Sequence, residues 1–119
     1  MDKSSNAWER HQQSVDALVR RLLRKGANGT ILVGAEYGPE GQRWRSGPYG
    51  ELDVLHEEFR NGRQYLTYYE VKTGENGQAA HRKAWQQAQT FFKRYPAQPG
   101  AHKTVVYVHP LYGVERWKE

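Results

Sequence analysis

The 119-residue sequence contains no cysteine. Disulfide bonds, thiolate zinc sites, iron–sulfur clusters and cysteine nucleophiles are therefore excluded. Long apolar runs are absent as well: nothing approaches the 18 consecutive apolar residues of a membrane-spanning helix, and no such run follows the charged start at residues 1–10. These absences predict a soluble intracellular protein, which we place in the cytoplasm.

Positive charge exceeds negative charge, with 18 Lys and Arg residues against 13 Asp and Glu residues and a net charge of +5 at pH 7. This excess is enough to attract a polyanion such as nucleic acid, but it is too small to make the whole surface basic. The length fits a single domain, 1–119, with one modest hydrophobic core.

Hydrophobic periodicity predicts the order helix, strand, strand, strand, helix, strand. Helices are expected at residues 6–25 and 81–96, each with an apolar stripe at helical spacing. Strands are expected at residues 30–37, 51–60, 63–72 and 103–109, and the tail 111–119 is a candidate for a further short strand. The expected fold class is α/β, a central mixed sheet flanked by both helices.

Asn61-Gly62 separates two of the predicted strands. This dipeptide is the strongest short-range signal for a two-residue hairpin turn, because both positions must adopt positive φ. A turn at these residues pairs Arg60 with Arg63 and fixes the register of the whole hairpin.

The same register brings charged side chains together at the far end of the hairpin. It places Asp53 opposite Glu70, and Glu51 opposite Lys72. Side chains alternate across a strand, so all four are expected on one face. Directly opposed Cβ atoms lie about 4.5–5.5 Å apart, close enough for two carboxylates to hold one cation.

Asp53 is unusual because aspartate is depleted in strand interiors, yet this residue lies between Leu52 and Val54. Its placement against a second acid lowers stability unless a cation compensates. Hard oxygen ligands suit Mg²⁺, which takes one or two protein carboxylates together with substrate phosphates and water. The hairpin therefore predicts a site for Mg²⁺ or Mn²⁺.

The stretches "GELDVL" (50–55) and "YYEVKTG" (68–74) resemble the motif of the PD-(D/E)xK nuclease superfamily. The resemblance is to small members such as the archaeal Holliday-junction resolvases and RecB-like nucleases. It spans most of the chain, because the restriction-endonuclease-like core of this superfamily also runs helix, three strands, helix, strand.

The resemblance implies a role for each matched residue. Asp53 stands for the metal-binding aspartate and Glu70 for the second acidic ligand. Val71 stands for the residue that lends a backbone carbonyl to the metal, and Lys72 for the lysine that positions or activates the attacking water. A metal stabilises the developing charge and lowers the pKa of a bound water, and the ammonium steadies the nucleophile and the phosphate. The implied activity is hydrolysis of a DNA phosphodiester to leave a 5′-phosphate.

The first predicted helix departs from the family pattern. Relatives place a glutamate on its inner stripe, where this sequence has His11 and Gln12. Glu9 is near, but at about 100° per residue it lies roughly 120° away from Val15, off the inner stripe. Glu51, on the predicted face of the other acids, is the candidate to replace the missing glutamate.

One glutamine and two tryptophans on the predicted helices can be explained either by a role in the site or by ordinary helix composition and packing. Gln87 matches a glutamine that many RecB-like members carry on the helix after the lysine, although glutamine is common on helices. Trp8 and Trp85 are interpreted as anchors that hold the helices to the core rather than as platforms for bases.

Two basic segments are candidates for contact with DNA. In the loop before the acidic face, two arginines can grip phosphates while an aromatic ring stacks on an unpaired base; these residues are Arg43, Trp44 and Arg45. The start of the second helix offers a second group for phosphate contact: His81, Arg82 and Lys83.

Three hypotheses about function remain open. The first is a Mg²⁺-dependent endonuclease on branched or structured DNA, because so small a domain has few elements for reading bases. A homodimer follows by analogy, since two symmetric cuts at a junction need two active sites.

The second hypothesis is a catalytically inactive nucleic-acid-binding module of the same fold. The third hypothesis is a structural protein whose acidic face binds a basic partner. Both DNA and RNA are candidate substrates, and repair, recombination, restriction and a mobile element are candidate pathways.

Overall fold

The computed structural model describes residues 3–38 and 49–119, with side chains from residue 6 onward. Within these ranges the chain forms two helices and five strands in the predicted order. The elements are α1 (Lys3–Arg24), β1 (Thr30–Tyr37), β2 (Gly50–Arg60), β3 (Arg63–Val71), α2 (Gly77–Arg94), β4 (His102–His109) and β5 (Gly113–Lys118). The tail therefore adds the short strand that the sequence suggested.

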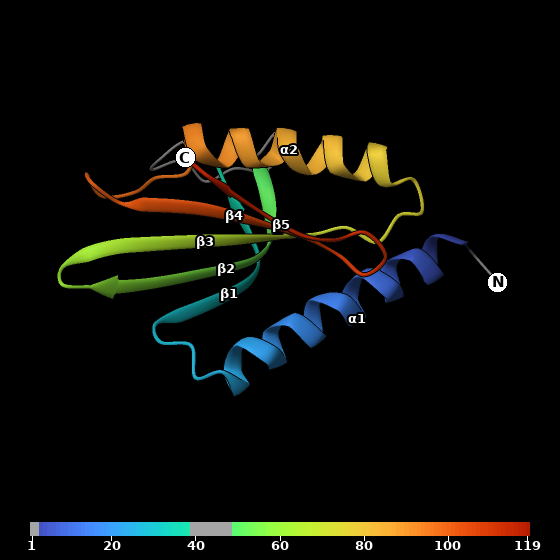
Figure 1. Cartoon of the computed structure of the whole chain (residues 1–119), viewed down its shortest axis with the longest axis horizontal. Helices are drawn as coiled ribbons and strands as arrows, with labels where there is room; N and C mark the ends of the chain where they lie inside the picture. Colours follow the sequence, from blue (N-terminus) through green and yellow to red (C-terminus); the bar gives the residue numbers. More distant parts are fainter. Residues whose placement is uncertain (1–2, 39–48) are drawn as a thin grey trace.

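The strands form one mixed sheet in the order β1-β2-β3-β4-β5. All neighbours are antiparallel except β3 and β4, which are parallel and are joined by the crossover through α2. Figure 1 shows α2 on one side of this sheet and α1 on the other. The expected α/β fold, with a central mixed sheet flanked by helices, is confirmed.

The hairpin turn forms as the sequence predicts. Asn61 has a φ of 53° and Gly62 a φ of 79°, the positive values that a two-residue turn of this kind requires. The pairs run in the predicted register from Arg60 and Arg63 up to Val54 and Tyr69. The turn thus directs the residues after Tyr69 and before Val54 toward the same end of the sheet.

Apolar side chains fill both faces of the sheet. The larger cluster lies under α2 and includes Leu52, Leu55, Leu66, Tyr68, Ala84, Ala88, Phe91 and Val105. The smaller cluster lies under α1 and consists of Val15, Leu18, Val54 and Val71. The end of the β2–β3 hairpin contributes to both clusters, so its charged residues lie close to buried apolar surface.

The ends of α2 differ from the predicted bounds. The side chain of Asn76 accepts a hydrogen bond from the backbone N–H of Ala79 at 3.0 Å, so Asn76 caps the helix. The helix then begins at Gly77, four residues before the predicted start. Its first turn carries no large apolar side chain, which is why periodicity alone did not mark it.

The interpretation of Trp8 as a helix anchor is wrong. Its side chain is 66% exposed, and α1 instead packs on the sheet through Val15 and Leu18. Trp85 is 45% exposed, although it packs edge-on against Trp117. Within the described ranges, neither helix combines the length and the apolar character that crossing a lipid bilayer requires.

Candidate active site at the end of the β2–β3 hairpin

Asp53 lies where the regular alternation of β2 is broken. Leu52 packs in the cluster under α2, whereas Val54 packs in the cluster under α1, although residues two apart normally share a face of the sheet. Opposite this point on β1, Gly34 has a φ of 68°, a conformation that glycine adopts far more readily than other residues. The backbone irregularity sets the direction of the Asp53 side chain.

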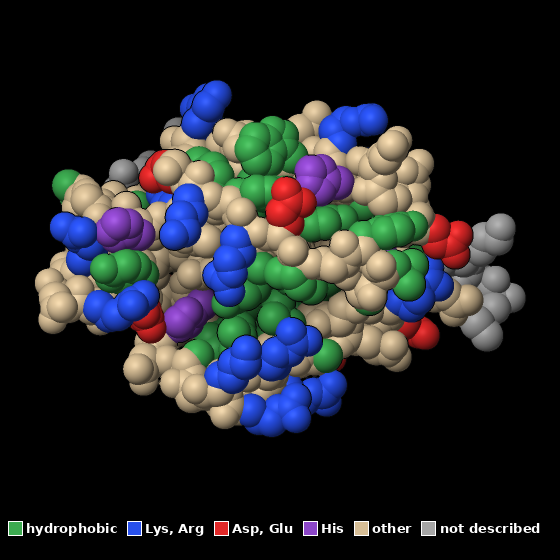
Figure 2. Space-filling model, viewed as in Figure 1, with side chains coloured by type: hydrophobic (Ala, Val, Ile, Leu, Met, Phe, Trp, Pro, Cys, Tyr) green, Lys and Arg blue, Asp and Glu red, His purple; other side chains and the backbone are tan. Residues whose placement is uncertain are grey.

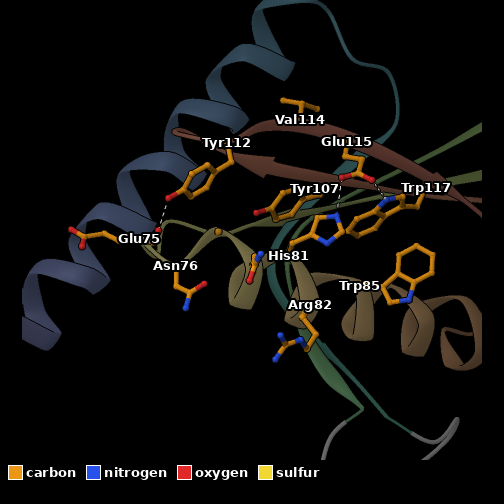
Figure 3. A pocket seen from close by; sticks show the side chains of 12 residues that line it. Glu75, Asn76, His81, Arg82, Trp85, Tyr107, Tyr112, Val114, Glu115 and Trp117 are labelled. Atoms are coloured by element: carbon orange, nitrogen blue, oxygen red, sulfur yellow. Dashed lines mark hydrogen bonds and ion pairs between the residues drawn. The ribbon is translucent and has the colours of Figure 1, made fainter.

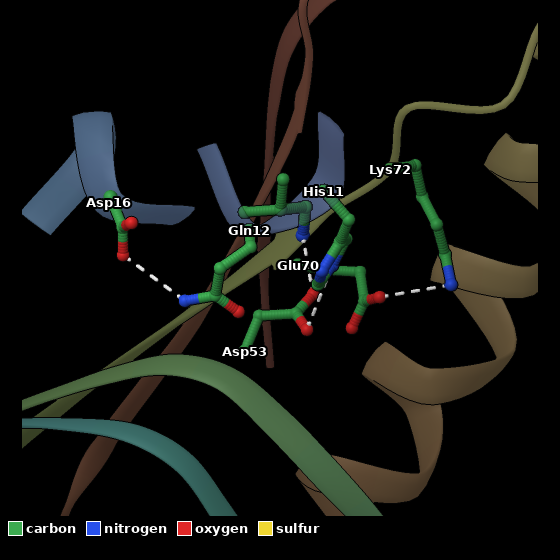
Figure 4. Close-up of polar contacts among 7 residues, drawn as sticks. His11, Gln12, Asp16, Asp53, Glu70 and Lys72 are labelled. Atoms are coloured by element: carbon green, nitrogen blue, oxygen red, sulfur yellow. Dashed lines mark hydrogen bonds and ion pairs between the residues drawn. The ribbon is translucent and has the colours of Figure 1, made fainter. Parts of the chain in front are cut away.

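The Asp53 carboxylate joins three elements. Its Oδ2 accepts a hydrogen bond from the backbone N–H of Val71 on β3 at 2.8 Å. Its Oδ1 lies 3.2 Å from Nε2 of His11 on α1. Figure 4 shows the two contacts side by side, with the Glu70 carboxylate next to that of Asp53. The predicted approach of the two acids is therefore present.

Glu70 is the most buried acid of the site, with 2% of its surface exposed. Its Oε1 lies 3.1 Å from Nζ of Lys72, and its Oε2 is buried without a hydrogen-bond partner among the described residues. Burial, followed by the charge of Asp53, raises the pKa of Glu70 to about 8, against the opposing effect of Lys72. A cation between the carboxylates would remove this electrostatic cost.

His11 belongs to the site. In the sequence it was noted only because it stands where relatives of the PD-(D/E)xK superfamily carry a glutamate. Its hydrogen bond to Asp53 raises its pKa, burial opposes the rise, and a backbone hydrogen bond at Val71 adds to it. Val15 and Leu18, four and seven residues later, are buried on the inner side of α1. Helical spacing therefore places His11 on the inward stripe, and this spacing was the available signal.

Gln87 lies between Lys72 and the start of β2. It lines a cavity of about 270 Å³ together with Lys72 and Thr90, and it also borders a small hollow beside Gly50 and Glu51. Its Oε1 is buried without a hydrogen-bond partner in the described part of the chain. The glutamine singled out from the sequence is thus adjacent to the site.

The other two candidate acids lie at the margin. Glu51 is exposed and is paired in register with Glu36 of β1. No ion pair between Glu51 and Lys72 is present among the described residues, where Lys72 pairs with Glu70 instead. Glu9 is exposed on α1.

The site can be compared with the ligands that Mg²⁺ prefers. The described residues contain no group of three or more His, Asp or Glu side chains placed to hold a metal ion. Two carboxylates do converge, however, and one of their oxygens, Glu70 Oε2, is buried and unpartnered among the described residues. Mg²⁺ needs only one or two protein carboxylates besides water and phosphate, so Asp53, Glu70 and the Val71 carbonyl fit it chemically.

The basic candidates for DNA contact are divided between the cavity beside Lys72, which Lys83 lines, other positions on α2, and the segment outside the described residues. The segment with Arg43, Trp44 and Arg45 lies outside them. His81 is engaged by Glu115, with 2.8 Å between His81 Nε2 and Glu115 Oε2. Arg82 and Lys83 are exposed on the first turns of α2. Among the described residues, therefore, the α2 start offers two cations without an ion-pair partner rather than three.

Comparison with known proteins adds no family. No family model and no curated protein matches the chain. A solved structure titled "Crystal structure of SSO0001" is similar with a TM-score of 0.44 and 16% sequence identity, over 90% of this chain. The chain spans 48% of the length of that protein.

Proposed function

We propose that this chain is a metal-dependent DNA endonuclease that hydrolyses phosphodiester bonds. The observation that carries the proposal is the convergence of Asp53 and Glu70 at the end of the hairpin, with Lys72 Nζ 3.1 Å from Glu70 Oε1. Two carboxylates held together beside an ammonium are unfavourable for folding and useful for binding a cation and a phosphate. The resemblance of residues 50–55 and 68–74 to the PD-(D/E)xK motif supports the same activity.

Each residue has a role that its position supports. Asp53, Glu70 and the Val71 carbonyl would hold Mg²⁺ or Mn²⁺, which when bound supplies charge stabilisation and a more acidic water. Lys72, partly buried at the rim of the cavity beside Gln87, is placed to bind the scissile phosphate or to hold the attacking water. The Gln87 oxygen, which has no hydrogen-bond partner among the described residues, is an acceptor for that water. Glu51 is close enough to the Gln87 hollow to act as a further acidic group.

The substrate class follows from size and charge. Few elements are available to read base edges, so contacts to the backbone and to the shape of branched DNA are favoured. In Figure 2, Lys and Arg side chains gather over α1 on the visible face, and the chain carries a net charge of +5. Such a surface attracts phosphates without specifying a sequence.

A homodimer completes this proposal, because two symmetric cuts at a four-way junction require two active sites. The edge strand β1 carries Leu32 and Val33, which are 42% and 52% exposed on opposite faces of the sheet, and this edge is the one we assign to the second copy. Light scattering of the protein with a junction should give two chains per junction. A single chain per junction would contradict the dimer.

The decisive experiment is cleavage of a labelled four-way junction with Mg²⁺ and with EDTA. We expect cutting only with the metal, and a loss of at least about 100-fold in rate for Asp53→Asn, Glu70→Gln and Lys72→Met. Asp16→Asn, which changes an exposed acid on the same helix as His11, is the matched control and should keep full activity. Unchanged rates in the three site variants would refute the proposal.

An inactive DNA-binding module of the same fold is the second candidate, and His11 favours it. Its imidazole contacts Asp53 at 3.2 Å and carries a raised pKa, so a protonated His11 can neutralise the acids in place of a metal. Metal-dependent stabilisation separates the two candidates. A working site should gain roughly 2.7 kcal/mol in free energy of unfolding at 100 times its dissociation constant for Mg²⁺, whereas an inactive module should gain nothing.

A further inference from the structure

A second hollow lies between the first turns of α2 and the strand β5. It is a groove of about 1170 Å³, and Figure 3 shows its lining side chains. Four aromatic rings dominate the lining: Trp85, Tyr107, Tyr112 and Trp117. Trp85 and Tyr112 are 45% and 55% exposed, so two large flat surfaces are open to a ligand.

The aromatic rings are held in place by one another. Trp117 packs edge-on against Trp85, with 5.1 Å between ring centroids, and stacks on Tyr107 at 5.8 Å with planes 15° apart. The hydroxyl of Tyr112 donates a hydrogen bond to the Glu75 carbonyl. A ligand entering the groove therefore meets surfaces that are already ordered, which lowers the entropic cost of binding.

The lining also carries two polar groups, one exposed and one buried. The Glu115 carboxylate accepts hydrogen bonds from Trp117 Nε1 at 3.0 Å and contacts His81 Nε2 at 2.8 Å. These contacts hold the Glu115 carboxylate at the groove, and its remaining oxygen lone pairs can accept hydrogen bonds from a ligand. The Tyr107 hydroxyl is buried and has no hydrogen-bond partner among the described residues. Its burial leaves Glu115 as the polar group that a ligand in the groove can reach.

We propose that this groove binds an unpaired nucleobase of the DNA substrate, an inference that rests on the proposed function. The base stacks on the exposed face of Trp85, since every base has a π-face that an aromatic ring can bind. Its amino edge donates to Glu115, whose side chain is 52% exposed. An apolar protein side chain would fill the same aromatic surface but would leave this carboxylate unused.

The position of the groove relative to the carboxylates agrees with this occupant. Glu75, at its rim, follows Lys72 by three residues, so their Cα atoms are at most about 11 Å apart. That distance corresponds to roughly three nucleotides along a DNA strand. The connecting loop is fixed by the hydrogen bond between His109 Nε2 and the Gly74 carbonyl at 2.7 Å. A strand crossing Lys72 can therefore reach the Glu75 rim of the groove, and Trp85 lies farther along it, on α2, ten residues after Glu75.

A phosphate contact is available beside the groove. Arg82 lines it and is exposed, whereas Lys83, one position later on α2, lines the cavity beside Lys72 and Gln87. Arg82 can hold the sugar–phosphate backbone of the nucleotide whose base enters. The groove thus combines a stacking surface, a hydrogen-bonding group for a base edge and a charge for a phosphate.

The test is fluorescence anisotropy of the full chain in EDTA, which measures binding without cleavage. The probe is a labelled duplex with a three-nucleotide single-stranded extension, compared with the same duplex whose extension carries abasic sugars. We expect the wild type to bind the first roughly 5- to 150-fold more tightly, the range that stacking of one base gives. Trp85→Ala should lose this preference. Trp8→Ala, which removes an exposed tryptophan from α1, should keep it.

A second measurement needs no variant. With 2-aminopurine in the extension, its fluorescence should fall when the wild type binds, because the base stacks on an indole. Equal affinity for the two extensions, or equal behaviour of Trp85→Ala and Trp8→Ala, would overturn the groove assignment. If the chain cuts a junction with Mg²⁺ but binds the normal and the abasic extension with equal affinity, the groove inference alone fails. If it binds no DNA at all, the proposed function fails with it.

Discussion

At the scale of single residues, Glu70 determines how the stability of this protein depends on pH. Its pKa is raised from 4.5 to about 8 by burial and by Asp53, so between these values the folded chain binds a proton that the unfolded chain has released. The stability it contributes is fully present below about 4.5 and is lost as pH rises through about 8. Without metal, we expect the free energy of unfolding to fall across this window by a few kcal/mol.

Urea denaturation in EDTA at several pH values measures this prediction. Glu70→Gln should flatten the profile, because the amide does not titrate. His11 acts in the same direction near its own raised pKa, so a shallow slope should remain in the variant. Glu58→Gln, which changes a β2 acid paired with Arg60, is the control and should keep the wild-type slope. Identical profiles for Glu70→Gln and wild type would show that Glu70 is not the responsible group.

The nearness of Asp53 to Glu70 and Lys72 could be predicted from the sequence because it depends only on local rules. The register that a turn at Asn61-Gly62 imposes was sufficient to bring these residues to one end of the hairpin, although the direction of Asp53 does not follow the regular alternation of β2. The contact of His11 with Asp53 depends instead on how closely α1 packs on the sheet, which is a tertiary property. Helical spacing indicates that His11 faces the sheet, but it does not predict that Asp53 is its partner.

At the scale of elements, the irregularity of β1 and β2 around Gly34 sets the direction of Asp53. An added Cβ at Gly34 meets only the Glu51 carboxylate, at 3.5 Å, so the cost of Gly34→Ala comes from its φ of 68°. We expect a loss of about 1–2 kcal/mol in free energy of unfolding. We also expect a clear drop in junction cleavage, because the strand relaxes toward regular alternation and turns Asp53.

Gly62→Ala is the matched control for this substitution. Gly62 has a φ of 79° and open space for a Cβ, so the backbone cost is similar, but the turn is at the opposite end of the hairpin from Asp53. Its stability should fall by a comparable amount while cleavage is kept. Equal cleavage by the two variants would show that Gly34 matters for stability alone.

Element order and most strand bounds could be predicted because hydrophobic periodicity and turn residues are local signals. The position of Asp53 within β2 shows where prediction from local signals fails. Its neighbours Leu52 and Val54 were expected to share a face, and they pack on opposite faces. The irregularity involves a glycine on a different strand, Gly34, and such a non-local adjustment has no signature in the sequence around Asp53.

At the scale of the whole molecule, the aromatic groove could not be predicted, because its lining comes from α2, β4, β5 and the loops before α2 and between β4 and β5. Trp85 and Trp117 are 32 residues apart in the sequence and meet only after the parallel pairing of β3 with β4 places β5 beside α2. The composition, in contrast, indicated a partner class directly, since a net charge of +5 favours a polyanion.

The salt dependence of DNA binding separates the two kinds of contact that we propose. Each phosphate contact releases counterions, so the logarithm of the affinity falls linearly with the logarithm of salt concentration. Arg82→Ala should reduce that slope by about 1 because it removes one phosphate contact. Trp85→Ala should weaken binding at every salt concentration and leave the slope unchanged, because a stacked base releases no counterion. Anisotropy titrations between about 50 and 200 mM salt measure both the slope and the affinity.

An affinity that does not vary with salt concentration would contradict both kinds of DNA contact. It would favour a protein that binds a basic partner through its acidic side chains, because binding to DNA phosphates always weakens as salt increases.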